Sequence, residues 1–138
     1  MKFKAHIYSD KTKNSLKIRS SLEKKIKSTS INKSKLIIVI GGDGFMLQTL
    51  KKFYKFKKPF YGLNSGTYGF LMNKFKTKKF IENIAKSKPV TISALQMVVK
   101  NKNNTTKKGI AINEISMFRQ SKQAATIQIK KGKKIIMK

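Results

Sequence analysis

The 138-residue sequence has no cysteine, a single histidine and only five carboxylates, which are Asp10, Glu23, Asp43, Glu82 and Glu114. Without cysteine the chain has no disulfide, no thiolate catalysis and no Cys-ligated zinc. One histidine cannot build a histidine-based metal site or a catalytic triad. These absences exclude many enzyme classes and leave few side chains that can act as an acid or a base.

Long apolar segments are also missing. The longest run, residues 36–40, is far shorter than the roughly 20 residues that a membrane-spanning helix needs. The N-terminus alternates charged and apolar residues and offers neither a signal-peptide core nor a small-residue cleavage site. We therefore expect a soluble, cytoplasmic protein with no membrane partner.

Negative charge is scarce, so the formal net charge is +28. Dense lysine favours binding to nucleic-acid phosphates. However, all basic residues except Arg19 and Arg119 are lysines spread along the chain, whereas base recognition favours the guanidinium group. A compositional bias toward Lys, Asn and Ile explains the charge as well as a binding face does. We favour that explanation and expect no nucleic-acid partner, although the charge would still steer anionic small molecules to the protein.

Strands and helices alternate in the first 88 residues. Phe3, Ala5 and Ile7 have the period of a strand, and the β-branched run at 36–40 suits a strand that is covered on both faces. This order predicts an α/β fold, with a Rossmann-like domain over residues 1–88. Three helices are also predicted: one within 11–28 with Leu16, Ile18, Leu22 and Ile26 inward, one after residue 44 with Leu47, Leu50 and Phe53 or Tyr54 inward, and one at 77–87 with Phe80, Ile81 and Ile84 inward. A strand at 59–64 and a loop at 65–69 complete the predicted elements.

After Pro89 no helical stripe appears. The patterns predict strands at 90–99, 110–118, 125–129 and 134–137, with hairpin turns at 101–109 and 130–133. We interpret residues 89–138 as the beginning of a second, β-rich, sandwich-like domain. So few strands bury little surface, so this domain looks unfinished.

The apolar run ends in a glycine turn, Gly41-Gly42-Asp43-Gly44, and a helix follows. Such a turn lies at the carboxyl edge of a parallel sheet, where glycines let a phosphate approach the backbone and the helix N-terminus adds positive charge. A carboxylate repels phosphate, so Asp43 makes sense as the base for an attacking hydroxyl or beside a divalent cation. The alternative is that Asp43 is only the N-cap of a helix that starts near Phe45.

Two more segments follow in order. Gly62-Leu-Asn-Ser-Gly-Thr-Tyr-Gly-Phe-Leu71 is a second glycine-rich loop after a strand, and Asn113-Glu114 lies in an apolar stretch. Together with Gly41-Gly-Asp-Gly44, these segments resemble the GGDG, G-x-N-x-G-x-x-G-F-L and N-E motifs of the NAD kinase family, bacterial branch. The resemblance covers essentially the whole chain. GGDG alone is weakly specific, because some lipid kinases and phosphofructokinases carry similar turns, but the second loop and the N-E pair fit neither.

The resemblance implies phosphoryl transfer from ATP, or from polyphosphate in some members, to the 2′-hydroxyl of the adenosine ribose of NAD, giving NADP. It makes Asp43 the general base, places Gly44 at the same ribose and lets Asn113 and Glu114 hold the dinucleotide. Phe70 either stacks on a base or fills the core. A divalent cation, Mg²⁺ with ATP, and a homo-oligomer of the full-length protein are also implied.

The chain departs from the family pattern in two ways. NAD kinases continue past the point that matches Lys138, with an aspartate–glycine segment and a T-P-x-G-S-T-A-Y-like segment, so we expect an N-terminal portion of such a kinase. Phe45 stands where many members have threonine.

Two other hypotheses stay open, a non-catalytic lysine-rich nucleic-acid-binding domain and another GGDG kinase that acts on a lipid or a sugar. For single residues, Glu114 has a solvent-facing alternative, and we expect Asn64 to satisfy its turn and His6 to be structural.

Overall fold

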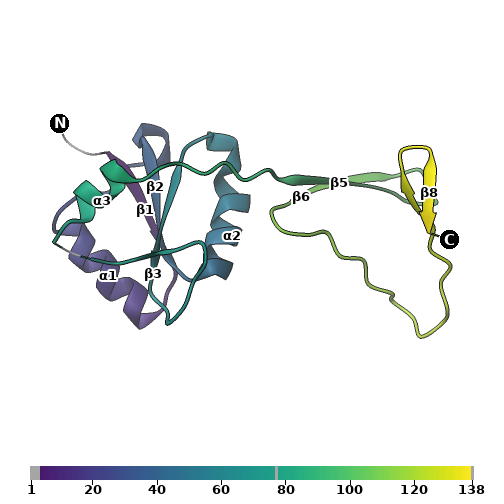
Figure 1. The fold of residues 1–138 in the computed structure, drawn as a ribbon, viewed down its shortest axis with the longest axis horizontal. Coiled ribbons are helices and arrows are strands. Elements are labelled where there is room, and N and C mark those ends of the chain that lie inside the picture. The colour runs from purple at the N-terminus through teal and green to yellow at the C-terminus, as the bar shows by residue number, and fades with distance from the viewer. Residues whose placement is uncertain (1–3, 77, 138) are drawn as a thin grey trace.

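A parallel sheet in the order β1-β2-β3-β4 organises the first part of the chain in the computed structural model, which describes residues 4–76 and 78–137. Helices separate β1, β2 and β3 along the chain, as Figure 1 shows, whereas β4 follows β3 without a helix between them. The predicted α/β fold is therefore confirmed. In chain order the elements are β1 (Ala5–Ser9), α1 (Lys13–Glu23), the 3₁₀ helix η1 (Ile31–Lys33), β2 (Leu36–Gly41), α2 (Asp43–Phe53), the 3₁₀ helix η2 (Tyr54–Phe56), β3 (Phe60–Asn64), β4 (Asn73–Lys74) and α3 (Phe80–Lys86).

The central strand β2 explains why its sequence is a continuous apolar run. Ile38 and Ile40 belong to a core cluster with residues of α1 and α3, whereas Ile37 and Val39 belong to a second cluster with residues of α2. All four side chains are fully buried. Figure 1 shows α1 and α3 on one side of the sheet and α2 on the other. Because neighbouring residues of a strand point to opposite faces, a strand between two helical layers needs apolar residues at every position.

The helical stripes were predicted only in part. Leu22 is buried as expected, but Leu16 is 46% exposed, since the buried position in the first turn of α1 belongs to Ser15. Ser15, Ile18 and Leu22 follow the helical period, and Leu16 lies one residue outside this stripe. In α3, Phe80 is buried and Ile81 is exposed. Two predicted strand or helix positions, Phe3 and Thr77, lie outside the described residues.

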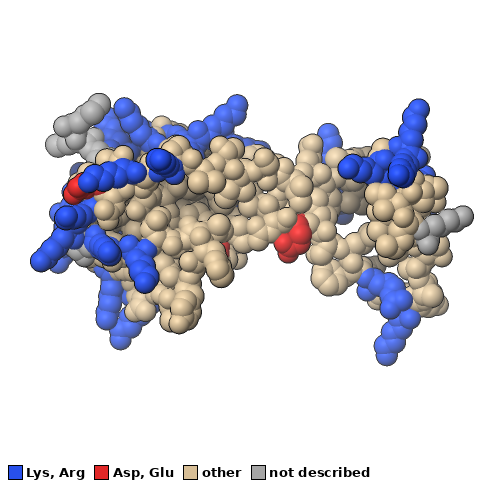
Figure 2. All heavy atoms as spheres, viewed as in Figure 1, with Lys and Arg blue, Asp and Glu red and all other residues tan. Residues whose placement is uncertain are grey.

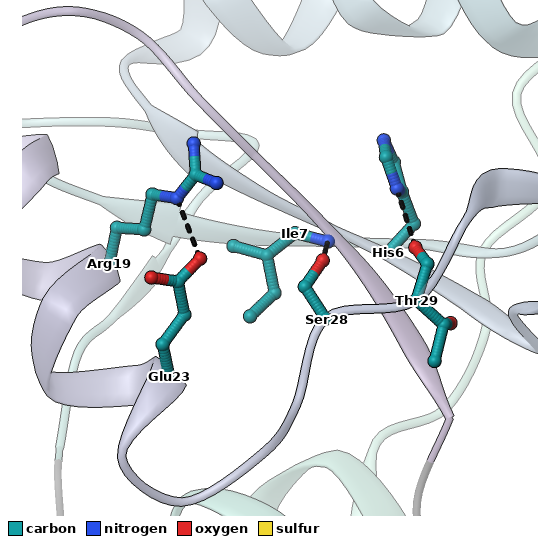
Figure 3. A network of polar contacts seen from close by, with 6 residues as sticks. All are labelled: His6, Ile7, Arg19, Glu23, Ser28 and Thr29. Carbon is teal, nitrogen blue, oxygen red and sulfur yellow. Dashed lines mark hydrogen bonds and ion pairs between the residues drawn. The ribbon is translucent and has the colours of Figure 1, made fainter.

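The outer edge of β1 is covered by the segment that follows α1 (Figure 3). The N–H of Ile7 donates to Ser28 Oγ at 3.1 Å, and His6 Nδ1 lies 2.9 Å from the carbonyl oxygen of Thr29. A carbonyl only accepts, so Nδ1 of His6 carries the proton. His6 is therefore structural, as predicted, and the edge strand is protected from pairing with other chains. The pair Arg19–Glu23 in the same view is an exposed i,i+4 contact, worth a few tenths of a kcal/mol.

Two antiparallel hairpins form the second part of the chain. They are β5 (Leu95–Lys100) with β6 (Thr106–Ala111), and β7 (Ile129–Lys131) with β8 (Lys134–Met137). The predicted strand at 110–118 is wrong beyond Ala111, because β6 begins inside the predicted turn and residues 112–118 are not a strand. Asn104 takes a positive φ of 59° and its N–H donates to the Asn101 carbonyl, which makes the turn tighter than its polar composition suggested.

The hairpins bury no residue in the part of the chain that the structure describes. Beyond Phe80 no described side chain is buried, and Val90 and Phe118 are 85% and 86% exposed. Figure 1 shows the hairpins extending away from the α/β part. The buried core of the described chain is thus entirely the core of the parallel sheet. Among the described helices, none is long and apolar enough to span a bilayer.

Candidate functional site

The loops that follow β1, β2 and β3 meet at one edge of the sheet. The N–H of Asp10, just after β1, donates to the Ile40 carbonyl at 3.0 Å, and the N–H of Ser65, just after β3, donates to the Gly41 carbonyl at 3.0 Å. The strands are parallel, so their carboxyl ends lie together, and this is the edge where open α/β sheets bind ligands.

Asp43 connects two of these loops. It is the first residue of α2, the N-cap is Gly42, and no side chain caps the helix, so the N-cap alternative for Asp43 is wrong. Its carboxylate instead accepts two backbone N–H groups, from Phe70 at Oδ2 over 2.7 Å and from Leu71 at Oδ1 over 3.0 Å. A carboxylate oxygen has two acceptor sites, so each oxygen of this half-buried side chain can accept one more hydrogen bond.

The glycines of the first turn fall into two classes. A Cβ atom on Gly41 would lie 2.8 Å from the Phe45 ring and 3.0 Å from Asp10 Oδ2, so Gly41 is required by the packing of the chain itself. A Cβ on Gly42 or Gly44 would meet nothing within 4 Å. The first N–H groups of α2 have no partner within the helix and carry partial positive charge. Gly42 and Gly44 therefore leave room for an anionic group beside these N–H groups.

The second glycine loop, residues 65–71, closes over Asp43. Asn64 Oδ1 accepts the N–H of Gly66 at 2.9 Å, so Asn64 satisfies the turn, as predicted. A Cβ on Gly69 would lie 3.0 Å from Asp43 Oδ1, so glycine lets the loop approach the carboxylate. The side chain of Phe70 is fully exposed, which excludes the core-filling alternative in this structure, and Tyr68 is 90% exposed. The loop thus presents two aromatic rings to solvent.

Asp10 is a site residue that sequence reasoning missed. The N–H and the hydroxyl of Thr12 donate to Asp10 Oδ1 at 3.0 and 2.8 Å. Burial alone would raise the pKa of Asp10, but hydrogen bonds from Ser15 and Thr12 outweigh it and lower the pKa below its ordinary value. The detectable signal was an acid and a cap residue between a strand and a helix, at the same sheet edge as the glycine turn.

Asn113 and Glu114 lie outside the parallel sheet, in the second part of the chain. They follow β6 at the end where Ala111 pairs with Leu95, which is the end of the hairpin that joins the α/β part (Figure 1). Both side chains are exposed. Within the described residues, no hydrogen bond or ion pair joins either of them to the glycine loops. The role of this pair in holding the dinucleotide therefore stays a prediction.

Two surface hollows of the described chain have lysine in their lining and do not include Asp43. One lies on the outer face of α1, with lining residues Lys13, Leu16, Lys17, Ser20, Ser21 and Lys24; the other is lined by Lys76, Lys78, Lys79 and Asn83. On the face that Figure 2 shows, Lys and Arg side chains lie at both ends of the molecule and few lie between them.

A protein-made metal cage is absent from the described part of the chain, where no group of three His, Cys, Asp or Glu side chains comes together. Mg²⁺ usually keeps several waters and takes one or two carboxylates together with substrate phosphates. Asp43, with an acceptor site left on each oxygen, fits that limited role. The described residues at this edge can therefore offer a carboxylate to a cation that arrives on a phosphate-bearing ligand.

Comparison with known proteins finds similar sequences over most of the chain. Residues 2–87 match the family model described as the ATP-NAD kinase N-terminal domain. The chain is similar to proteins named NAD kinase from Brucella suis, with 40% identity over 124 residues, and from Rickettsia typhi, with 39% identity over 125 residues. These matches cover 90% and 91% of this chain but 48% and 49% of the relatives. The chain thus spans about half the length of the curated relatives that it matches.

Proposed function

This chain belongs to the NAD kinase family, and on that premise we propose that it takes part in phosphoryl transfer from ATP to the 2′-hydroxyl of the adenosine ribose of NAD. The products are NADP and ADP. The observation that carries the proposal is the position of Asp43, a half-buried carboxylate at the start of α2, held by two backbone N–H groups and adjoining the open space at Gly42 and Gly44.

Asp43 has the chemistry of a general base in this reaction. One of its oxygens accepts the proton of the 2′-hydroxyl while the ribose oxygen attacks the γ-phosphorus and the bond from that phosphorus to ADP breaks. The N–H groups of Phe70 and Leu71 keep the carboxylate in one orientation. This matters because proton transfer needs a hydrogen-bond distance between base and hydroxyl.

The phosphates are the ligands that suit the first glycine turn. Gly42 and Gly44 leave the backbone accessible, and the N-terminus of α2 favours negative charge. With MgATP as the donor, Asp43 would offer one carboxylate to the cation, and the ATP phosphates would supply further ligands. Polyphosphate is a second possible donor, because the turn recognises phosphate and not a base. The net charge of +28 would draw either donor toward the protein.

The dinucleotide is held by residues outside the turn in this proposal. Phe70 offers a fully exposed ring for stacking on a base. Asn113 and Glu114 supply an amide and a carboxylate for the ribose hydroxyls once the second part of the pocket is in place. We further propose that the complete enzyme is a homo-oligomer and works in the cytoplasm.

The test is NADP formation from NAD and MgATP. The chain is assayed alone and joined to the half of the Brucella suis relative that the match leaves uncovered, since only half of that relative is represented here. We expect activity in the joined protein that is lost on Asp43→Asn. A joined protein that is folded but forms no NADP with either MgATP or polyphosphate would overturn the proposal.

A further inference from the structure

A buried serine links helix α1 to the second glycine loop. Ser15 is 0% exposed, and its Oγ lies 2.7 Å from Oγ of Ser65, which is 50 residues further along the chain. Buried hydroxyl groups nearly always have a hydrogen-bond partner, and no buried side-chain nitrogen or oxygen of the described residues lacks one. The contact with Ser65 is therefore part of how Ser15 is accommodated in the core.

Ser65 is held at its main chain as well. The side-chain amide of Asn14 donates to the Ser65 carbonyl at 3.3 Å, and the N–H of Ser65 donates to the Gly41 carbonyl at 3.0 Å. Ser15 in turn is fixed at the start of α1, where its N–H donates to Thr12 Oγ1 at 3.3 Å. The first residue of the second glycine loop is thus tied to the first turn of α1.

The same loop is tied at its other end to Asp43. Between the two anchors lie residues 66–69, which include Gly66 and Gly69. Glycine is the most conformationally free residue, so a stretch with two of them has little stiffness of its own. Because only four residues separate the two anchors, holding Ser65 restricts the conformations of the loop and lowers the entropy cost of placing the Phe70 and Leu71 N–H groups on the carboxylate.

We propose that Ser15 is a positioning residue for Asp43, acting through Ser65 and the second glycine loop. It fixes the start of the loop, so that the N–H groups of Phe70 and Leu71 reach the carboxylate and hold it for the ribose hydroxyl. The catalytic consequence rests on the proposed function, whereas the effect on the loop does not. Ser15 itself lies behind the loop and touches no reacting atom.

The effect on the loop is measured by hydrogen exchange of the backbone amides in the complete 138-residue chain. In Ser15→Ala and Ser65→Ala, we expect the Phe70 and Leu71 amides to exchange between about twofold and tenfold faster, the range for losing one hydrogen bond. Ser20→Ala is the matched control, because Ser20 is an exposed serine on the same helix. The amides of Ile38 and Val39 in β2 report on general loosening and should keep their rates.

A second arm separates positioning from stability in the joined protein described above. Ser15→Ala should lower the kcat of NADP formation by a similar factor, and Ser20→Ala should not. In an Asp43→Asn background the same change should have no further effect on kcat, because the group that Ser15 positions is already lost. A general structural defect would instead lower kcat in both backgrounds.

The outcomes are distinguishable. If the joined wild-type protein forms no NADP, the proposed function fails while the exchange result still decides the role of Ser15 in the loop. Unchanged exchange at Phe70 and Leu71 in both Ser15→Ala and Ser65→Ala overturns the inference. An equal rise in the exchange rates of the Ile38 and Val39 amides also overturns the inference. Ser65 is only half-buried, so Ser65→Ala serves as the test if Ser15→Ala does not fold.

Discussion

The backbone N–H of Phe70 donates to Oδ2 of Asp43 over 2.7 Å, although the two residues are 27 positions apart in the chain. Hydrogen bonds to a charged acceptor are stronger than neutral ones. The acid at the tip of β2 therefore ties the loop after β3 to the loop after β2. Asp43 uses the same carboxylate atoms in its structural role and in its proposed chemical role. The effects of an Asp43 variant must therefore be followed by more than one measurement.

Asp43→Asn should lower the rate of NADP formation in the joined protein by about 10²–10⁴-fold, the usual contribution of a general base. The amide replaces one acceptor oxygen with a donor, so it also sets an NH₂ group against the N–H of Phe70 or Leu71. One of these two amides should then exchange faster with solvent. Steady-state kinetics and amide exchange on the same sample measure both effects.

Glu82→Gln is the control for the Asp43 variant. Glu82 is exposed and pairs with Lys86 on α3, so its neutralisation removes one charge without touching the glycine loops. Its NADP formation should match the wild type. Turnover that is unchanged in Asp43→Asn would remove Asp43 from the role of base, whatever happens to the loop.

The amino-acid pattern predicted the sheet better than it predicted the site. The run at 36–40 identified a doubly covered strand because every residue of such a strand must be apolar. The partners of Asp43 were not predictable in this way, since they are backbone N–H groups that any residue at positions 70 and 71 would supply. Ser15 was missed because a small polar residue inside an apolar stripe looks like an interruption of it.

The strand bounds after Pro89 could not be predicted for a different reason. Alternation of apolar and polar residues marks a strand only when one of its faces is buried. Both faces of β5 and β6 are mostly exposed in this structure, so burial does not determine where these strands begin and end. Lys107 and Lys108 accordingly lie in β6 where the composition suggested a turn.

Gly41→Ala should destabilise the α/β part by about 1–3 kcal/mol, the usual cost of forcing extra volume into a packed site. The added Cβ would lie 2.8 Å from the Phe45 ring and 3.0 Å from Asp10 Oδ2. Gly42→Ala is the control, because that Cβ meets nothing within 4 Å. Urea unfolding of the two variants measures the difference, and equal stability would show that the turn relaxes at no cost.

Gly44→Ala should separate stability from binding. Gly44 lies in the first turn of α2, where alanine is favoured over glycine by up to about 1 kcal/mol, and its Cβ would enter open space. We therefore expect unchanged or higher stability. If the open space is the phosphate site, the same methyl group should raise the KM for MgATP severalfold. A KM that stays at the wild-type value would place the phosphates elsewhere.

Phe70 and Phe80 form a matched pair of aromatic residues. Phe70 is fully exposed and Phe80 is 3% exposed in the core. Phe70→Ala should leave the free energy of unfolding within about 0.5 kcal/mol of the wild type, whereas Phe80→Ala should lower it by about 3–5 kcal/mol. If Phe70 stacks on a base of NAD, its loss should raise the KM for NAD by about fivefold or more, since aromatic stacking on a base is worth about 1–3 kcal/mol. An unchanged KM would exclude stacking while leaving the stability prediction intact.

Asp10 should make the stability of the α/β part depend on pH. Its folded-state pKa is lowered, since the hydrogen bonds from Ser15 and Thr12 that favour the charged form outweigh the opposing effect of burial. A carboxyl whose pKa falls on folding stabilises the protein above its unfolded pKa, here the ordinary value of 3.8, and this contribution is lost as the pH falls through the lower folded value.

The urea midpoint of the wild type should therefore drop as the pH is lowered from 5 toward 3. Asp10→Asn keeps an acceptor for Thr12 but does not titrate, so its midpoint should drop less over this range, while Glu114→Gln, which alters an exposed carboxyl, should follow the wild type. The same pH dependence in Asp10→Asn and the wild type would mean that other carboxyl groups carry the effect.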